Sequence, residues 1–539
     1  MQHFNIITRR GFLDRSLKIG LGVALSTLTD IPFVMKRALA EGKIGLNGKK
    51  LLFIFLRFGN DGLNSLIPIE DPVYPLNRVK IQIPRSGAVN PYAATGVMDD
   101  PNLSAPGFPT YAFNAGNGFA ALHPSLKYLA PVYNAGDLAL IHRVGYPRQS
   151  RSHFDSQIYW ENGNPNNNIS KDGIFSRTLL ESGLANTNPL TGVSIQSALP
   201  LLLRGSDAAM TNLSDPTRFR LLGLPNNAAG LSKATNSIVS ANGFSSVDKL
   251  NRDLLNSQYK NLNIALNQFG DGSMFSETNN TFQDTVLGSG YYLFPTATAK
   301  NPNSVVDSGA YSFFKNLKAA ALILNKTDAI IAGTELGGFD THNDQIVHDD
   351  ILGTVDPLSG GHANLQKRIG WAIYALQRYF LQHADKATWD NTVVVTLSEF
   401  GRTSAENGTF GTDHAEAGPM FVAGGGVKGY GKGRRTTGIF GCHTSDTYNG
   451  VSVPWIPGTT GKTGSMFGVS TSYLKRAVDY RSVLGEIIRD HLGATQSQLD
   501  RIIPAYSIAG QKLQSGGVTT NTTAEKTDGT TIAGELDIV

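Results

Sequence analysis

Long apolar runs that end in clusters of polar residues constrain the fold of this chain most strongly. Residues 392–397 and 50–56 are almost continuously apolar, as expected of strands covered on both faces of a sheet. Other segments continue the pattern: strands are predicted at 138–142, 329–334 and 420–423, and helices at 121–134, 311–325, 362–383 and 480–492. This alternation predicts an α/β fold, with a doubly wound, mixed but mostly parallel sheet sandwiched by helices.

Two regions depart from this alternation. Between about residues 160 and 305 the chain is rich in Asn, Ser and Gly, and only residues 246–268 show a clear amphipathic helical pattern. We interpret this stretch as an inserted, cap-like region of a domain spanning residues 41–510. Residues 511–539 are rich in Ser, Thr and Gly, and we predict a disordered tail because they have little apolar surface to bury.

The amino terminus has the pattern of a twin-arginine signal peptide. Arg9 and Arg10 precede a modestly apolar stretch at 19–28, and residues 38–40 (Ala-Leu-Ala) offer a cleavage site after Ala40. The alternative is an ordinary amphipathic helix. The signal predicts export by the twin-arginine machinery, with a periplasmic or extracellular location for the mature protein. Export of this kind accommodates a protein that folds and acquires a metal before it crosses the membrane.

Charge and cysteine content exclude several classes of protein. Residues 1–40 hold six basic and two acidic side chains, which leaves 41 of each in the rest of the chain. A mature chain of zero net charge gives no support for nucleic-acid binding. Residues 17–35 are too interrupted for a stable membrane span, and no later segment qualifies. Cys442 is the only cysteine, so it cannot form an internal disulfide, and we interpret it as a buried or incidental thiol.

Four of the apolar strands lead into residues able to bind metals or anions. In an open α/β sheet, ligands bind beyond the carboxyl ends of the strands, so we expect these residues to meet at one edge. Mixed oxygen and nitrogen ligands suit one or two Zn²⁺, Mn²⁺ or Fe ions. The residues in question are Asp61 after the first strand, Ser152, His153 and Asp155 after the second, Asp340 and His342 after the third, and Glu399, Arg402, Asp413 and His414 after the fourth.

The same segments suggest catalytic roles. Ser152 is a candidate nucleophile, and Arg151 or Arg402 could clamp the oxygens of a phosphoryl or sulfuryl group. Structural alternatives stay open for each of them. Ser152 could cap a helix that begins at His153, and Glu399 could form an ion pair with Arg402.

A glycine-rich segment at 424–433 superficially resembles a phosphate-binding loop. It lacks the terminal Lys-Ser/Thr of such loops and no convincing helix follows it. We interpret it as a flexible turn beside the site.

Taken in order, these motifs resemble the exported bacterial family called domain of unknown function 1501. The resemblance covers roughly residues 50–500. It rests on the twin-arginine leader and five motifs, at residues 55–64, 151–155, 338–342, 398–403 and 411–414.

That family in turn resembles distant members of the alkaline phosphatase and sulfatase superfamily. The resemblance implies a metal centre with Asp61, Asp340, His342, Glu399, Asp413 and His414 as ligands and Ser152 as nucleophile. Phe400 follows Glu399 at a position where the superfamily commonly has histidine.

Two functions are compatible with this pattern. The first is an exported, metal-dependent hydrolase acting on a small anionic ester of phosphate or sulfate. The second is a non-catalytic exported binding or scaffold protein that retains the fold. The Ser-His and Asp-His segments favour the first, whereas Phe400 after Glu399 favours the second.

Overall fold

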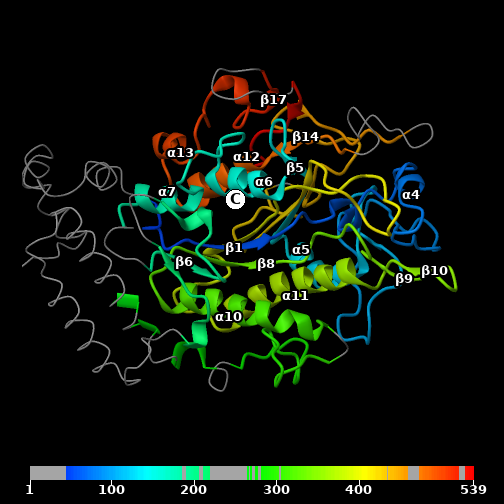
Figure 1. Cartoon of the computed structure of the whole chain (residues 1–539), viewed down its shortest axis with the longest axis horizontal. Coiled ribbons are helices and arrows are strands. Elements are labelled where there is room, and N and C mark those ends of the chain that lie inside the picture. Colours follow the sequence, from blue (N-terminus) through cyan, green and yellow to red (C-terminus); the bar gives the residue numbers. More distant parts are fainter. Residues whose placement is uncertain are drawn as a thin grey trace, which may run out of the picture.

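A nine-stranded sheet forms the centre of the computed structural model, with helices on both of its faces (Figure 1). The structure describes residues 44–184, 190–205, 210–218, 264–265, 268–269, 273–276, 281–302, 305–433, 435–458, 473–520 and 529–539. The predicted signal peptide therefore lies outside the described residues, as does nearly all of the amphipathic segment at 246–268.

The sheet is mixed and mostly parallel, as predicted. Its strands run in the order β13-β5-β12-β11-β1-β8-β6-β7, and β16 also pairs with β5. Among the described strands of this sheet, only β12 runs antiparallel to its neighbours. The bounds are β1 Lys50–Leu56, β5 Leu138–Gly145, β6 Gly192–Ile195, β7 Thr211–Asn212, β8 Ile331–Leu336, β11 Thr392–Leu397, β12 Gly418–Ala423, β13 Ile439–Phe440 and β16 Val478–Asp479.

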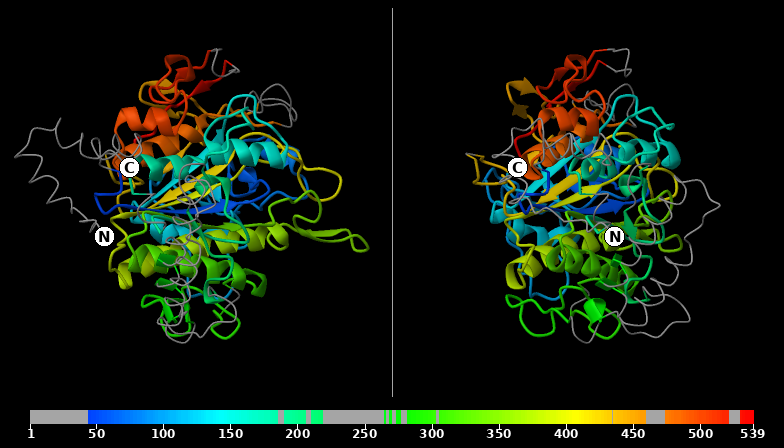
Figure 2. Two further views of the ribbon diagram at one scale, coloured as in Figure 1. Left: turned by 60° about the vertical axis from the view of Figure 1, so that its left-hand side comes forward. Right: turned by 90° about the vertical axis from the view of Figure 1, so that its left-hand side faces the viewer.

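Two groups of helices cover the two faces of the sheet. In Figure 1 one group lies above the sheet and the other below it, and Figure 2 shows the same layers from two other sides. The upper group is α6 His153–Asn162, α7 Ile174–Glu181, α12 Tyr480–Glu486 and α13 Gln496–Ile502. The lower group is α5 Ala130–Asn134, α10 Tyr311–Lys326 and α11 Gly361–Gln382.

Smaller elements complete the structure. The short helix α4 spans Tyr74–Asn77, and the remaining strands form small sheets of two or three strands. These strands are β2 Leu66–Ile67, β3 Phe113–Asn114, β4 Ala121–Leu122, β9 Val347–Asp349, β10 Thr354–Asp356, β14 Thr447–Tyr448, β15 Val451–Ser452, β17 Gly517–Val518 and β18 Thr531–Ile532.

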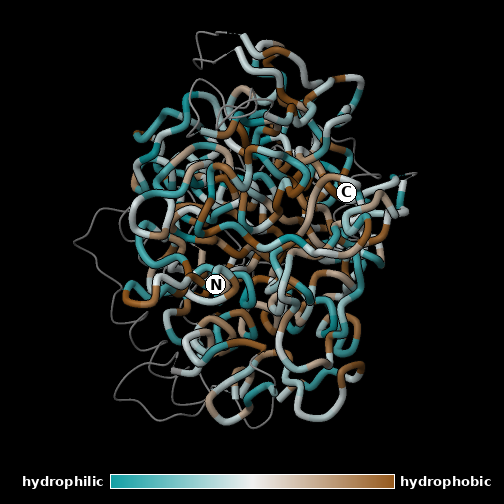
Figure 3. Tube along the Cα trace, turned by 90° about the vertical axis from the view of Figure 1, so that its right-hand side faces the viewer, coloured by the Kyte–Doolittle hydropathy of each residue, from teal (hydrophilic) through white to brown (hydrophobic). Residues whose placement is uncertain are grey.

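The sequence of strand β1 is continuously apolar because both faces of the strand are covered. Successive side chains of a strand point to opposite faces. Leu52 and Ile54 therefore enter the core between the sheet and helices α10 and α11, whereas Phe53 and Phe55 enter the core between the sheet and helices α6 and α12. Both cores are closed, and every residue of β1 is buried. Figure 3 shows hydrophobic stretches of the trace passing through the middle of the molecule.

One predicted helix, at residues 121–134, is replaced by three shorter elements. Residues 121–134 form strand β4, a 3₁₀ helix at Pro124–Leu129 and then the short helix α5. Pro131 stands in the first turn of α5, where its missing N–H costs nothing. In the interior of one continuous helix the same residue would remove a hydrogen bond.

The interpretation of residues 160–305 as an insertion is wrong for part of that region. Strand β6 pairs in parallel with β8, from Gly192 opposite Ile331 to Ile195 opposite Thr334. Strand β7 extends the same sheet. The region therefore contributes two strands to the central sheet, and β6 escaped prediction because it is only four residues long.

The prediction of a disordered tail is also wrong for the part that the structure describes. Strands β17 and β18 pair with each other, and Ile532, Leu536 and Ile538 are buried in the upper core. The buried carboxylate of Glu486 accepts hydrogen bonds from the backbone N–H groups of residues 536–539. Burial raises the pKa of Glu486 to about 7, although these donors oppose the shift.

None of the helices among the described residues is both long enough and apolar enough to span a membrane.

Candidate metal centre

Three neighbouring parallel strands end at one edge of the sheet, and the segments that follow them hold most of the predicted site. Phe55 of β1 lies opposite Leu397 of β11, and Leu56 lies opposite Leu336 of β8, so the three strand ends are level. An antiparallel bridge between Arg402 and His414 returns the chain to this edge. The predicted convergence of the β8 and β11 segments is therefore observed.

Ligand atoms from three segments meet at this edge. One ligand atom each from His153, Asp340 and His414 lie within 4.8 Å of one another. The Oδ1 atom of Asp340 is 3.4 Å from Nε2 of His153 and 3.1 Å from Nε2 of His414. His342 joins them, because its Nε2 lies 3.2 Å from Asp340 Oδ1 and 2.9 Å from His414 Nε2. Two imidazoles and one carboxylate, those of His153, His414 and Asp340, thus present their ligand atoms to a common space, and His342 lies beside two of them.

Each of these imidazoles is fixed by an oxygen atom at its other nitrogen. Nδ1 of His153 lies 2.9 Å from Glu399 Oε1, and Nδ1 of His342 lies 2.9 Å from Asp413 Oδ1. Nδ1 of His414 lies 2.8 Å from the carbonyl oxygen of Arg151. Because these oxygens only accept hydrogen bonds, each Nδ1 carries a proton and each Nε2 faces the other ligand atoms.

This arrangement suits a bound cation. Nε2 of His342 and Nε2 of His414 cannot hydrogen-bond to each other while both rings are neutral, and the buried Nε2 of His153 has no hydrogen-bond partner among the described residues. A metal ion with bonds of about 2.0–2.1 Å in tetrahedral geometry separates its ligand atoms by roughly 3.3 Å. The separations of 2.9–3.4 Å observed here are compatible with that spacing.

Electrostatics keeps these ligands in their metal-binding forms. Burial raises the pKa of Asp340, but the hydrogen bond and the charge of Arg402 outweigh it and lower that pKa to about 2. Burial lowers the pKa of His414. The carboxylate is therefore ionised and the imidazole neutral at physiological pH.

Glu399, a predicted metal ligand, instead positions His153. Its side chain is fully buried, and Oε1 accepts hydrogen bonds from the backbone N–H of Phe58 and from Gln157, as well as from His153. The ring of Phe400 lies 4.7 Å from the rings of both His153 and His414 and packs beside them. Carboxylates that hold a ligating histidine by its far nitrogen are common in metal sites.

Asp413 holds the ring of His342 in the same way that Glu399 holds the ring of His153. Its Oδ1 binds Nδ1 of that ring and also accepts a hydrogen bond from Asn407 at 3.2 Å. The prediction that Asp413 is itself a ligand therefore does not agree with the structure.

Asp61 lies outside the cluster, which corrects another predicted ligand. Both of its oxygens accept hydrogen bonds from the buried Arg78, at 2.6 and 2.9 Å, and one also accepts from Gln345. Burial raises the pKa of Asp61, but the charge and hydrogen bonds of Arg78 lower it to about 2. The two side chains form a fully buried ion pair that joins the β1 loop to residues 403–404, whose carbonyls Arg78 also binds.

The two predicted anion-binding arginines differ from each other. Arg402 is buried and donates to the carbonyl oxygens of Phe58, Gly59, Phe339 and Thr412 and to Asp340. It therefore positions loops and Asp340, and its burial keeps it from clamping a substrate as predicted. Arg151 is exposed, and its guanidinium contacts the hydroxyl group and ring of Tyr473.

Ser152 caps helix α6, which agrees with the predicted alternative to a nucleophile. Its hydroxyl accepts a long hydrogen bond of 3.5 Å from the backbone N–H of Asp155, and α6 begins at His153. This position places Ser152 directly before a residue of the cluster and at the positive end of a helix dipole.

His153 is among the residues that the sequence marks as able to bind a metal, although the predicted ligand set does not include it. Like Asp340 and Glu399, it follows a buried strand.

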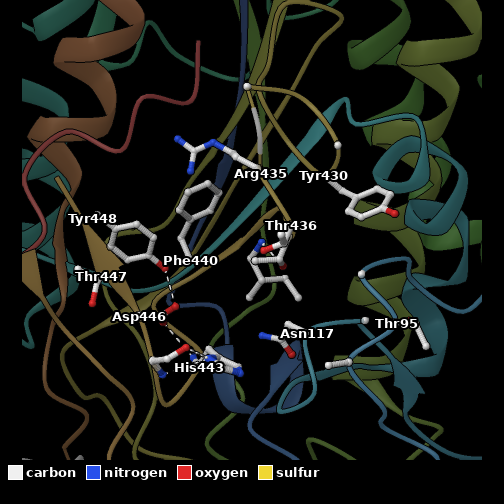
Figure 4. A pocket seen from close by; sticks show the side chains of 18 residues that line it. Thr95, Asn117, Tyr430, Arg435, Thr436, Phe440, His443, Asp446, Thr447 and Tyr448 are labelled. Carbon is white, nitrogen blue, oxygen red and sulfur yellow. Dashed lines mark hydrogen bonds between the residues drawn. The ribbon is translucent and has the colours of Figure 1, made fainter. Parts of the chain in front are cut away.

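The glycine-rich segment lines a different cavity, so its predicted place beside the site is wrong. Tyr430, Gly431 and Gly433 border a cavity of about 860 Å³ together with Arg435, Asp446 and other residues (Figure 4). None of the cluster residues lines this cavity.

The fold and the site together define a class of protein. It is an α/β domain with a cluster of histidines and carboxylates at the carboxyl ends of its parallel strands. Residues 49–432 match the family described as protein of unknown function DUF1501, and the chain belongs to that family. Comparison with curated proteins and with solved structures found no match.

Proposed function

We propose that this chain is an exported, metal-dependent hydrolase of phosphate or sulfate esters. One observation carries the proposal: the ligand atoms of His153, Asp340 and His414 lie within 4.8 Å of one another, with Nε2 of His342 beside them, while each ring is held at its far nitrogen. Mixed nitrogen and oxygen ligands favour a single Zn²⁺, Mn²⁺ or Fe ion at this place. When bound, such an ion supplies Lewis-acid activation of a phosphoryl or sulfuryl oxygen.

The exposure of the cluster favours a catalytic over a purely structural role. Structural metal sites are closed, whereas catalytic sites leave one position open to substrate. The side chain of Asp340 is 43% exposed and that of His342 is 36% exposed. Their carboxylate and imidazole groups can therefore be reached from solvent.

The start of α6 supports an anionic substrate. Ser152 and the first N–H groups of this ten-residue helix lie next to His153, and a helix N-terminus stabilises negative charge. We retain Ser152 as the proposed nucleophile because the same positive end would stabilise its alkoxide. Arg151 is the proposed oxyanion-binding residue, since its guanidinium is exposed and its carbonyl oxygen holds His414.

The proposed fold relationship is to the alkaline phosphatase and sulfatase superfamily. It rests on the order of the motifs and on the metal-ligand segments at the strand ends. We also propose export by the twin-arginine pathway and a periplasmic or extracellular location, on the strength of residues 1–40.

A second candidate is a non-catalytic scaffold or binding protein. It is favoured by Phe400, whose ring occupies the space beside His153 and His414 where a further ligand would stand.

The test is hydrolysis of aryl phosphates and aryl sulfates by protein purified without chelators. We expect turnover of at least one of the two classes, loss of that turnover after treatment with a chelator, and recovery when one divalent metal is restored. Bound metal without turnover of either class would favour the scaffold.

Ser152→Ala separates a nucleophile from a helix cap. Loss of the cap alone should cost about 1 kcal/mol of folding free energy, whereas loss of the nucleophile should also reduce kcat by at least about a hundredfold. Thr495→Ala is the matched control, because Thr495 caps α13 in the same way. We expect both variants to keep wild-type metal content and only Ser152→Ala to lose turnover. Equal turnover in the two variants would assign Ser152 to the cap alone.

A further inference from the structure

A pocket of about 550 Å³ adjoins the metal centre on the side of α6. Phe58, Phe154 and Gln157 line its near wall, whereas Lys171 and Arg204 line it from segments further along the chain. The ring of Phe58 lies edge-on to His153 at 5.3 Å, and Gln157 donates to Glu399 at 3.1 Å. Two residues that line the pocket therefore contact His153 and Glu399 of the centre, although none of the four cluster residues lines the pocket itself.

The apolar part of the pocket is unusually exposed. The side chain of Phe154 is 84% exposed although it follows His153 directly, and that of Phe58 is 39% exposed. Aromatic side chains in contact with water beside a polar centre are typical of binding sites. They suit the face of a ring in the bound molecule.

The charged side chains that line the pocket include more cations than anions. Arg57 is already committed, because it pairs with Glu161 at 2.6 Å and with Glu335 at 3.0 Å, and these three side chains together carry one net negative charge. Lys171 and Arg204 are exposed, and neither has an ion pair or a side-chain hydrogen bond with a described residue. The pocket thus offers two uncommitted cations, and a guanidinium beside an ammonium favours carboxylate or phosphate.

We propose that this pocket binds the alcohol part of the ester, and that this part is a ring carrying a second anionic group. This inference rests on the proposed hydrolase function. The phosphate or sulfate group lies at the metal centre, the ring lies against Phe58 and Phe154, and the second anion meets Lys171 and Arg204. Residues of the 160–305 region thus determine specificity.

Calorimetric binding of two probes tests the proposal without relying on turnover. The probes are (4-carboxyphenyl)phosphonate, which carries the second anion, and phenylphosphonate, which lacks it, because neither has an ester bond that the proposed hydrolase could cleave. We expect Lys171→Ala/Arg204→Ala to weaken binding of the first probe about tenfold, as expected for the loss of charge-assisted contacts, and to leave the second unchanged. Phe154→Ala should weaken both. Lys300→Ala/Lys326→Ala removes the same charge from exposed positions outside the pocket and should bind both probes like the wild type.

The outcomes separate this inference from the function on which it rests. If the Lys171→Ala/Arg204→Ala protein binds both probes like the wild type and keeps its metal, the pocket assignment is wrong and the proposed hydrolase stands. If the wild type does not prefer the carboxylated probe, the assignment is likewise overturned. Loss of the metal-dependent turnover described above would remove the proposed function itself.

Discussion

Protein carrying His414→Ala is expected to bind metal more than about a hundredfold more weakly than the wild type, a larger effect than the 10–100-fold typical for partners that only orient a ligand. His414 Nε2 lies within 3.1 Å of both Asp340 Oδ1 and His342 Nε2, so its removal opens the middle of the cluster. Elemental analysis of protein purified without chelators, followed by competition with a chelator of known affinity, measures this loss.

His348→Ala is the matched control for that experiment. His348 also contacts two carboxylates, those of Asp344 and Asp350, but it lies on the exposed β9 strand and shares no ligand atom with the cluster. The variant should keep wild-type metal content. Equal metal content in the His414→Ala protein and the wild type would show that His414 is not a ligand.

Protein carrying Asp61→Ala is expected to lose about 3–5 kcal/mol of folding free energy, because the substitution leaves a buried arginine without its counter-charge. Arg78 has no exposed side-chain surface and binds both oxygens of Asp61. Denaturant unfolding measures the loss. Glu70→Ala breaks an exposed pair with Arg85 and should cost less than about 1 kcal/mol.

The pH dependence of stability follows from the same pair. The pKa of Asp61 is lowered from 3.8 to about 2, so the ion pair stabilises the fold fully above the ordinary value. That contribution is lost as the pH falls from 3.8 through 2. Asp61→Ala protein that remains folded should keep wild-type metal content. Loss of metal from a folded variant would show that Asp61 is a metal ligand.

The sequence predicted the central sheet well because its strands are long and buried on both sides. A buried strand such as β11 consists almost entirely of apolar residues, and this pattern is hard to mistake. Strand β6 has only four residues and owes its place to pairing with β8, a contact that no local pattern reveals. The tail was misjudged because a few apolar residues, among them Ile532 and Ile538, suffice to dock it when Glu486 accepts its backbone N–H groups.

The sequence located the site but could not assign the role of each carboxylate. Asp340, Glu399 and Asp413 all follow β8 or β11, yet only Asp340 directs an oxygen into the cluster. The difference depends on where each side chain points, which is set by packing against Phe400 and by Arg402. The role of Asp61 was decided by Arg78, a residue that carried no motif of its own.

The most direct test of the metal centre is anomalous X-ray scattering from crystals of the unmodified protein, recorded at the absorption edge of the metal found by elemental analysis. We predict one peak within about 2.0–2.2 Å of Nε2 of His153 and His414 and of a carboxylate oxygen of Asp340. The account is contradicted if no peak occurs among these three residues, or if the metal is instead bound by Asp61.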